Sequence, residues 1–185
     1  MAGMRAVDPR VSFAELSAWP DDGRRYELYG GEPIVVPAPN LRHQRVVVAL
    51  VEVLVEYERR SGGCVVTAPF DIVLSDYDVL QPDVVFFGPA KRAHLNPLEA
   101  AYLVPDVAVE VLSRSTEARD RGRKMALLAR YGLPEYWLID PTRSALEIYV
   151  LRNGALTLSG VFSLGERAES PTLPDLGIVV QRLFD

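Results

Sequence analysis

The segment Val-Ala-Val-Glu-Val-Leu at residues 107–112 is a dense β-prone run that a single carboxylate, Glu110, interrupts. An earlier run, Gln-Pro-Asp-Val-Val-Phe-Phe at residues 81–87, carries Asp83 just before four apolar residues. Strands that are apolar on both faces are covered on both faces, so these runs predict the centre of a sheet. An ionised carboxylate there carries a large desolvation cost unless it is paired or bound to metal. The two carboxylates are therefore the first candidates for function.

Strand geometry predicts how these carboxylates would meet. Side chains alternate across a strand, so an antiparallel pairing that sets Asp83 opposite Glu110 also sets Val85 opposite Ala108 on the same face. Directly opposed Cβ atoms lie about 4.5–5.5 Å apart. Two carboxylates at that distance repel, and one pKa rises, unless a divalent cation neutralises both. Oxygen ligands completed by water are what Mg²⁺ prefers, so the pattern predicts a Mg²⁺ or Mn²⁺ site.

Two main helices are expected to flank this sheet. Asn40 is placed to cap a long helix that runs to about Ser61, with an apolar stripe along it. Ser115 or Thr116 caps a second helix, which ends at Tyr131 before a glycine. Strands are expected at residues 25–29, 33–36, 64–68, 70–74, 80–87, 106–112, 135–140, 146–151 and 155–162.

The remaining segments complete the expected architecture. A Ser-x-x-Glu capping box at residues 12–15 predicts a short helix. Residues 88–105 are expected to form a loop with one helical turn near 98–101, and residues 173–184 an edge strand. The expected class is a mixed sheet with flanking helices and extra β-hairpins, α/β or α+β. The whole chain, residues 1–185, is expected to form a single domain.

Composition excludes several classes of protein. With 49% hydrophobic residues and a net charge of −5, the chain is not expected to be disordered or to coat nucleic acid through bulk charge. No apolar run approaches the length of a membrane span, and a lone cysteine favours the cytoplasm. The glycine-rich nucleotide-binding motifs, C-x-x-C, H-E-x-x-H and G-x-S-x-G are all absent from the sequence.

Lysine usage singles out one residue of the second helix. Of the 20 basic residues, only Lys91 and Lys124 are lysines. On an α-helical wheel Lys124 falls near Asp120, at the border of the apolar face, where it could reach the end of the neighbouring strand. Its ammonium can deprotonate or hold a water more readily than a guanidinium can. The same helix, residues 114–130, has an excess of basic residues that could steer a phosphate backbone.

Each candidate also has a purely structural interpretation. Asp83 could accept backbone hydrogen bonds at a strand start, and Glu110 could belong to a buried ion pair. Asp120 and Lys124 have the spacing of an ordinary surface ion pair. His43 near the start of the long helix is compatible with a packing role.

Glu27 is the candidate with the plainest structural interpretation. It lies in the strand expected at residues 25–29, where it would alternate outward into solvent if Tyr26 and Leu28 face the core.

Taken in chain order, these residues resemble a known superfamily. The order of the carboxylates and the lysine is similar to that of PD-(D/E)XK nucleases, and the whole chain more closely resembles the Uma-two group of bacterial restriction-endonuclease-like proteins. The stretches that carry the resemblance are Tyr26-Glu27-Leu28, His43, Gln81-Pro82-Asp83-Val84-Val85, Val109-Glu110-Val111-Leu112-Ser113, Asp120 with Lys124, and Glu135-Tyr136-Trp137-Leu138-Ile139-Asp140-Pro141. The chain departs from the superfamily at Leu112, which stands where the Glu-x-Lys element has lysine. The resemblance implies that this lysine has migrated to the next helix, as Lys124.

The resemblance implies a restriction endonuclease-like core and a Mg²⁺- or Mn²⁺-dependent endonuclease. Its partner would be nucleic acid, DNA rather than RNA, and the protein would form a homodimer. Asp83, Glu110 and the backbone carbonyl of Val111 would hold the metal. Lys124 would position or deprotonate the attacking water.

Three residues would support this centre. Glu27 would add a ligand or support a second ion, Asp120 would orient Lys124, and His43 would be a further supporting residue.

Two alternatives remain from the sequence. The first is a non-catalytic dimeric binding protein that retains the nuclease fold, which the acidic composition favours. The second, a glycosidase with two carboxylates, is weaker because the carboxylates are expected to lie too close together and few aromatics are expected to be exposed.

Overall fold

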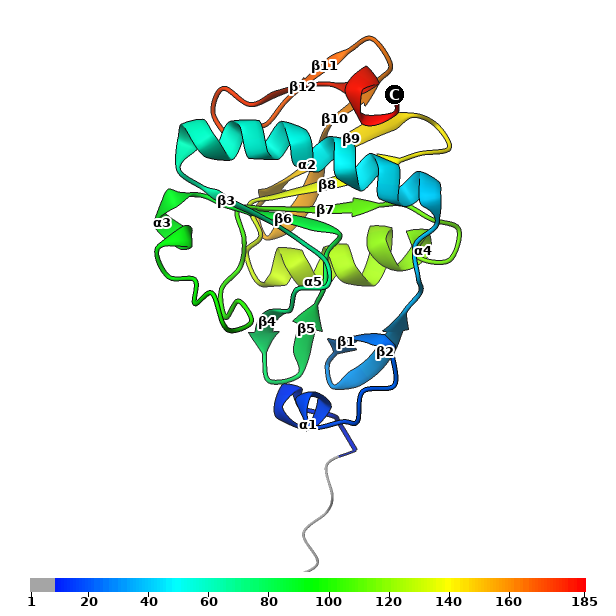
Figure 1. Ribbon diagram of the computed structural model, residues 1–185, viewed down its shortest axis with the longest axis vertical. Coiled ribbons are helices and arrows are strands. Elements are labelled where there is room, and N and C mark those ends of the chain that lie inside the picture. Colours follow the sequence, from blue (N-terminus) through cyan, green and yellow to red (C-terminus); the bar gives the residue numbers. More distant parts are fainter. Residues whose placement is uncertain (1–8) are drawn as a thin grey trace, which may run out of the picture.

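The computed structural model describes residues 9–185, and a six-stranded mixed sheet forms its centre (Figure 1). Only the contact between β7 and β8 is parallel, and all other neighbours are antiparallel. In spatial order the strands are β10 (Ala155–Ser163), β9 (Ala145–Arg152), β8 (Glu135–Asp140), β7 (Val107–Val111), β6 (Val84–Phe87) and β3 (Cys64–Thr67).

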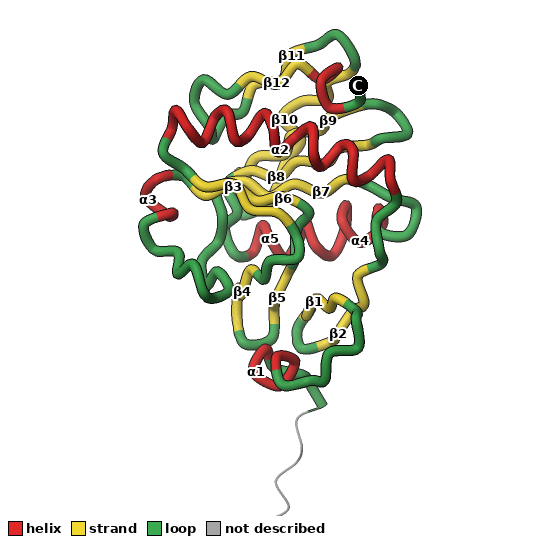
Figure 2. The backbone as a smooth tube through the Cα atoms, viewed as in Figure 1, coloured by secondary structure: helices red, strands yellow, loops and turns green. Residues whose placement is uncertain are grey.

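Helices cover both faces of this sheet (Figure 2). One face packs against α2 (Leu41–Ser61), which Asn40 caps through a bond from the N–H of His43 and which ends at Gly62 in the left-handed region. The other face packs against a helical segment that changes type along its length. Its parts are α4 (Glu117–Arg119), a π-helical turn η1 (Asp120–Lys124) and α5 (Met125–Arg130).

Side-chain alternation in β6 explains why both faces are covered. Val84 and Phe86 belong to the core cluster under α2, whereas Val85 and Phe87 belong to the cluster that contains Leu128 of α5. The sequence prediction of a mixed sheet between two main helices is confirmed.

A second, four-stranded sheet lies at the α5 side of the molecule, next to α1 (Figure 1). Its spatial order is β2, β1, β5, β4. The elements are α1 (Phe13–Ser17), β1 (Arg25–Tyr29), β2 (Glu32–Val36), β4 (Ile72–Ser75) and β5 (Asp78–Leu80). The predicted capping box of α1 is present, and so is the predicted hairpin of β1 and β2.

The single strand predicted at residues 80–87 is wrong. This stretch forms the end of β5 in the small sheet and the whole of β6 in the large one. Pro82 lacks the N–H that a central strand donates, and the N–H of Gln81 donates to the Glu27 carboxylate instead of to a strand. The chain therefore passes from one sheet to the other at this point and leaves Asp83 at the start of β6.

Two further expectations are corrected. The helical turn in the loop is α3 (Pro89–Arg92), not residues 98–101, because Pro89 is suited to a first helical turn. The tail adds no strand to the edge of the large sheet: β12 (Gly177–Val179) pairs with β11 (Arg167–Glu169) in a separate ribbon, and a 3₁₀ helix, η2 (Val180–Leu183), follows. No helix within residues 9–185 has the length and apolar character to cross a bilayer.

A bidentate ion pair between Arg121 and Glu147 connects the π turn to the large sheet. Arg121 donates to both oxygens of Glu147, at 2.6 and 2.8 Å, and the hydroxyl of Tyr149 donates to the same carboxylate at 2.7 Å. The hydrogen bond from Arg121, reinforced by that from Tyr149, lowers the pKa of Glu147 despite its burial. Glu147 is 5% exposed and the Arg121 side chain is 29% exposed, so solvent screens the pair in part.

We expect Glu147→Gln to lower the free energy of unfolding by about 1–3 kcal/mol at neutral pH. Because the folded-state pKa is depressed, the stabilisation is present above the unfolded-state pKa of about 4.3 and is lost as the pH falls through the folded-state value. Urea unfolding across a pH series would measure the difference between wild type and variant. The difference in unfolding free energy between wild type and variant should shrink as the pH falls below about 4, near the pKa of an unfolded glutamate. A difference that stays constant there would contradict the assignment.

Candidate active site

Asp83, just before β6, and Glu110, near the end of β7, lie opposite each other. The register Val84 to Val109 and Val85 to Ala108 is the predicted one, and its next step sets Asp83 against Glu110. Burial raises the pKa of Glu110 well above its ordinary value, and the nearby charge of Asp83 adds to that rise, while Lys124 opposes it. The two carboxylates therefore form an electrostatically strained pair.

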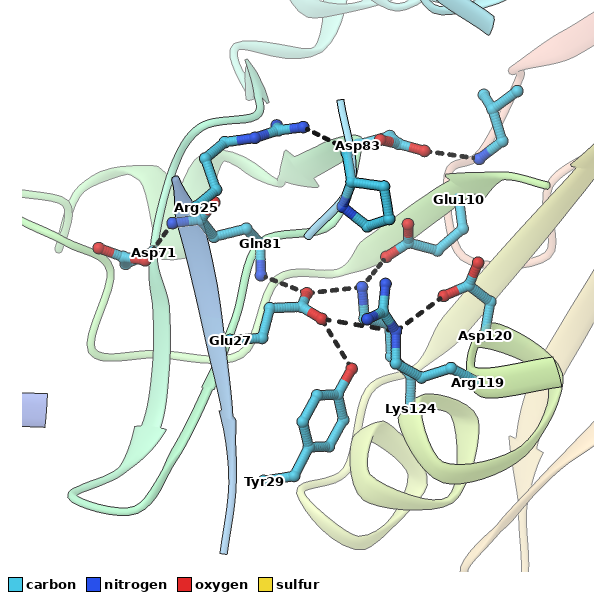
Figure 3. Close-up of polar contacts among 12 residues, drawn as sticks. Arg25, Glu27, Tyr29, Asp71, Gln81, Asp83, Glu110, Arg119, Asp120 and Lys124 are labelled. Atoms are coloured by element: carbon cyan, nitrogen blue, oxygen red, sulfur yellow. Dashed lines mark hydrogen bonds and ion pairs between the residues drawn. The ribbon is translucent and has the colours of Figure 1, made fainter. Parts of the chain in front are cut away.

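Both oxygens of Asp83 are held in place. Oδ2 accepts from the backbone N–H of Val111 at 2.8 Å (Figure 3), and Nε2 of His43 lies 3.1 Å from Oδ1. His43 reaches this carboxylate from the first turn of α2. Because the N–H and C=O of one strand residue point toward the same neighbour, the carbonyl of Val111 also lies on the Asp83 side of β7.

Lys124 joins two strands from different sheets (Figure 3). Its Nζ lies 2.6 Å from Oε1 of Glu27 and 2.7 Å from Oε1 of Glu110, and its side chain is 2% exposed. Burial alone would lower the pKa of Lys124, but the charges of Glu110 and Glu27 outweigh that and raise it well above its usual range. The ammonium is therefore a protonated donor in this arrangement.

A π-helical turn points Lys124 inward. The turn Asp120–Lys124 buries both of its terminal residues, and α5 continues directly from it. Such turns are rare and occur frequently at functional sites. An α-helical wheel places Lys124 only at the border of the apolar face, so the wider turn accounts for its deeper position.

The expectation that Glu27 faces solvent is wrong, because its exposed fraction is 0%. Both faces of β1 are covered by other parts of the protein, so the alternation of side chains along this strand does not expose Glu27 to solvent. Besides Lys124, the carboxylate accepts from the N–H of Gln81 at 2.9 Å and from the hydroxyl of Tyr29 at 2.8 Å. Burial would raise the pKa of Glu27, but the charge and hydrogen bond of Lys124 more than offset it, and the pKa is lowered.

Asp120 is buried beside the lysine but is not its partner. Among residues 9–185, no ion pair joins Asp120 to Lys124, so the structural interpretation of a surface i, i+4 pair is wrong for this turn. Nε of Arg119 lies 3.9 Å from Oδ1 of Asp120, and both atoms lack a hydrogen-bond partner although they are buried. Burial raises the pKa of Asp120, and Lys124 opposes that rise.

A pocket of about 120 Å³ brings most of the predicted residues together. His43, Asp83, Glu110 and Lys124 line it, whereas Glu27 supports it from behind Lys124. The lining residues that sequence reasoning did not single out include donors that suit a phosphate, namely Arg25, Ser113, Ser115 and Thr116. The run of hydroxyl residues directly after the strand of Glu110 was the available signal for three of them.

The predicted excess of basic charge on residues 114–130 is partly neutralised within the protein. Arg121 pairs with Glu147, and Nη1 of Arg123 lies 2.5 Å from Oε2 of Glu32. Arg119 remains the basic side chain of this segment, besides Lys124, that lines the pocket.

The oxygen atoms that the pocket offers as ligands suit a hard divalent cation. Asp83 and Glu110 supply carboxylate oxygens, and Oε2 of Glu110 accepts no hydrogen bond from residues 9–185. Within the same residues, no three His, Cys, Asp or Glu side chains are grouped to hold a metal ion. An ion would therefore be bound by two carboxylates, a carbonyl and water. Mg²⁺ commonly binds in this way, with one or two carboxylates and several retained waters.

Comparisons with known proteins agree with this fold. The model of the Uma2 family, described as "Putative restriction endonuclease", matches residues 13–181. A crystal structure from Anabaena variabilis ATCC 29413, described as "a putative nuclease belonging to DUF820", is 18% identical with a TM-score of 0.77, covering 94% of this chain and 97% of that chain. At that identity the likeness shows the fold. The comparison with curated proteins gave no match.

Proposed function

Because this chain belongs to the Uma2 family of restriction endonuclease-like proteins, we propose that it is a divalent-metal-dependent endonuclease that hydrolyses phosphodiester bonds of DNA. The observation that carries the proposal is the pairing of Asp83 with Glu110 across β6 and β7, in a pocket where a buried lysine contacts Glu110. DNA is the substrate that the family description favours.

Asp83, Glu110 and the carbonyl of Val111 would hold one Mg²⁺ or Mn²⁺ ion. When bound, the ion supplies Lewis-acid polarisation of the phosphate and lowers the pKa of a bound water. His43 and the N–H of Val111 fix the orientation of the Asp83 carboxylate, which supports a preorganised site.

Lys124 would stabilise negative charge on the phosphate and position the attacking water through its N–H groups. Glu27 holds the ammonium from the other side and is a positioning residue, because it lies behind Lys124 and does not line the pocket. Asp120 adds negative charge near the ammonium without pairing with it.

The pocket also contains groups that suit the phosphate itself. The hydroxyl of Ser113 lies 3.1 Å from that of Ser115 and 3.0 Å from that of Thr116, just before the helical segment. The side chains of Arg119 and Arg25, which also line the pocket, complete a rim of donors. Donors of this kind position a nucleic-acid backbone without reading its sequence.

The test is conversion of supercoiled plasmid to nicked circles by the purified protein. We expect nicking with Mg²⁺ or Mn²⁺ and its loss when the chelator EDTA is added, because the carboxylate pair would need the ion to bind the phosphate. Plasmid that stays intact with both ions, while calorimetry shows that the ions bind, would contradict the nuclease and favour the non-catalytic binding protein. The oligomeric state, proposed to be a homodimer, can be measured on the same sample by light scattering.

A further inference from the structure

A second pocket, of about 210 Å³, adjoins the proposed catalytic one. Arg25 and Gln81 line both pockets. In Figure 3, Asp71 and Arg25 lie on the left, Glu110 and Lys124 lie on the right, and Gln81 lies between them. None of the roles proposed above for catalysis uses the second pocket.

An aromatic pair forms one wall of this pocket. Trp19 follows α1 and is 41% exposed, and its ring packs edge-to-face on Tyr26 with centroids 5.4 Å apart and planes at 84°. The hydroxyl of Tyr26 donates to Asp22 at 2.7 Å, which fixes the ring that supports the indole. By contrast Trp137 is fully buried and donates to Glu135. An exposed, braced indole beside a phosphate site is a platform on which a nucleobase can stack.

Two of the polar residues that line this pocket, Gln81 and Asp71, offer acceptors. One N–H of the Gln81 side-chain amide is engaged by its 2.8 Å bond to Oδ1 of Asp71. The amide oxygen of Gln81 is buried and has no hydrogen-bond partner, and Oδ2 of Asp71 accepts no hydrogen bond from residues 9–185. A buried acceptor without a donor is destabilising, and a ligand that brings N–H groups relieves it. Exocyclic amino groups of nucleobases supply such donors.

We propose that the second pocket binds one unpaired nucleobase that carries an exocyclic amino group, stacked on Trp19, next to the phosphate held in the catalytic pocket. Arg25, which belongs to both pockets, contacts the backbone between the two. This inference rests on the proposed function and names its substrate class: nucleic acid with a single-stranded or extruded nucleotide at the cleavage site. A base inside a duplex cannot enter such a pocket without being extruded.

The test uses binding without metal, so that it does not depend on cleavage. Short oligodeoxycytidine and oligodeoxyuridine of equal length differ at position 4 of the base, which is an amino group in cytosine and a carbonyl in uracil. They also differ at N3, which carries a hydrogen only in uracil. We expect oligodeoxycytidine to quench the tryptophan fluorescence in EDTA, because Trp19 is exposed whereas Trp137 is buried. Oligodeoxyuridine and duplex DNA should bind about tenfold more weakly or worse.

Two variants at Trp19 separate stacking from a change in folding. By fluorescence anisotropy of labelled oligodeoxycytidine, Trp19→Ala should weaken binding by roughly 5- to 100-fold, and Trp19→Phe should retain most of the affinity. Asp71→Asn, which places a donor in the pocket, should reduce the preference for cytidine over uridine.

Two outcomes would overturn the inference: equal affinity of Trp19→Ala and wild type, or equal affinity for the two oligonucleotides. Metal-dependent nicking together with either result would leave the proposed function intact and remove only the base pocket. If the protein prefers oligodeoxycytidine but does not nick plasmid, the result would support the base pocket and contradict the proposed nuclease activity.

Discussion

Lys124→Met is expected to lower the free energy of unfolding by about 3–5 kcal/mol, because it removes the ammonium that lies between two buried carboxylates. Nε of Arg119 lies 3.9 Å from Glu27, too far to replace the hydrogen bonds of that ammonium. Glu27 is 0% exposed and Glu110 5% exposed, so water cannot replace the ammonium that lies 2.6 and 2.7 Å from them. Methionine matches the length of the lysine stem, so the change tests the charge more than the packing. Chemical denaturation at neutral pH measures the loss.

The chain offers a matched control, since it has only one other lysine. Lys91 pairs with Asp106 at 2.8 Å, but its side chain is 31% exposed, so Lys91→Met should cost no more than about 1 kcal/mol. Adding Glu27→Gln to Lys124→Met should restore part of the lost stability, because it removes one of the uncompensated charges. A Lys124→Met variant as stable as Lys91→Met would show that the carboxylates are not charged as inferred.

The second large effect is expected on activity. Asp83→Asn should reduce plasmid nicking by at least about a thousandfold, since Lewis-acid catalysis by a metal is worth several kcal/mol and each 1.4 kcal/mol is about tenfold. The side chain keeps its shape, and its remaining oxygen can still accept from the N–H of Val111. The loss of activity should therefore occur without a comparable loss of stability. Titration calorimetry should show weaker Mn²⁺ binding in the same variant.

Asp106→Asn is the matched control for Asp83→Asn. Asp106 immediately precedes β7 at the opposite end of its pairing with β6, where it accepts from the N–H of Gly88 at 2.7 Å. It does not line the catalytic pocket, so nicking and Mn²⁺ affinity should match the wild type. Unchanged Mn²⁺ affinity of Asp83→Asn would remove this residue from the proposed metal site.

The pairing of the two central strands could be predicted from sequence because it depends on local periodicity. Carboxylates in otherwise apolar runs stand out, and alternation fixes which residues share a face, so the register of Val85 with Ala108 is confirmed. The long helix from Asn40 to Gly62 is confirmed for the same reason, since its caps are local signals.

Long-range packing explains what the sequence could not show. Glu27 is buried because β1 lies beside a helical segment almost a hundred residues later in the chain, and alternation within one strand contains no trace of that contact. The split of residues 80–87 depends on the N–H of Gln81 finding its acceptor in the carboxylate of Glu27, on the neighbouring strand β1. The second pocket likewise forms from α1, β1 and the link between β5 and β6, which are separate in the sequence.

The π turn at Asp120–Lys124 makes this stretch sensitive to chain length rather than only to composition. Deleting a single residue from it would return the segment to the ordinary helical repeat and keep α4 and α5 facing as before, because the wider turn accommodates one residue more than an α-helical turn. Inserting a residue would instead rotate α5 by about 100° relative to α4. Either the ammonium of Lys124 would then leave its two carboxylates, or Leu128 would leave the core. Substitutions at exposed Arg123 should thus be tolerated during evolution far more often than insertions of one codon in the turn.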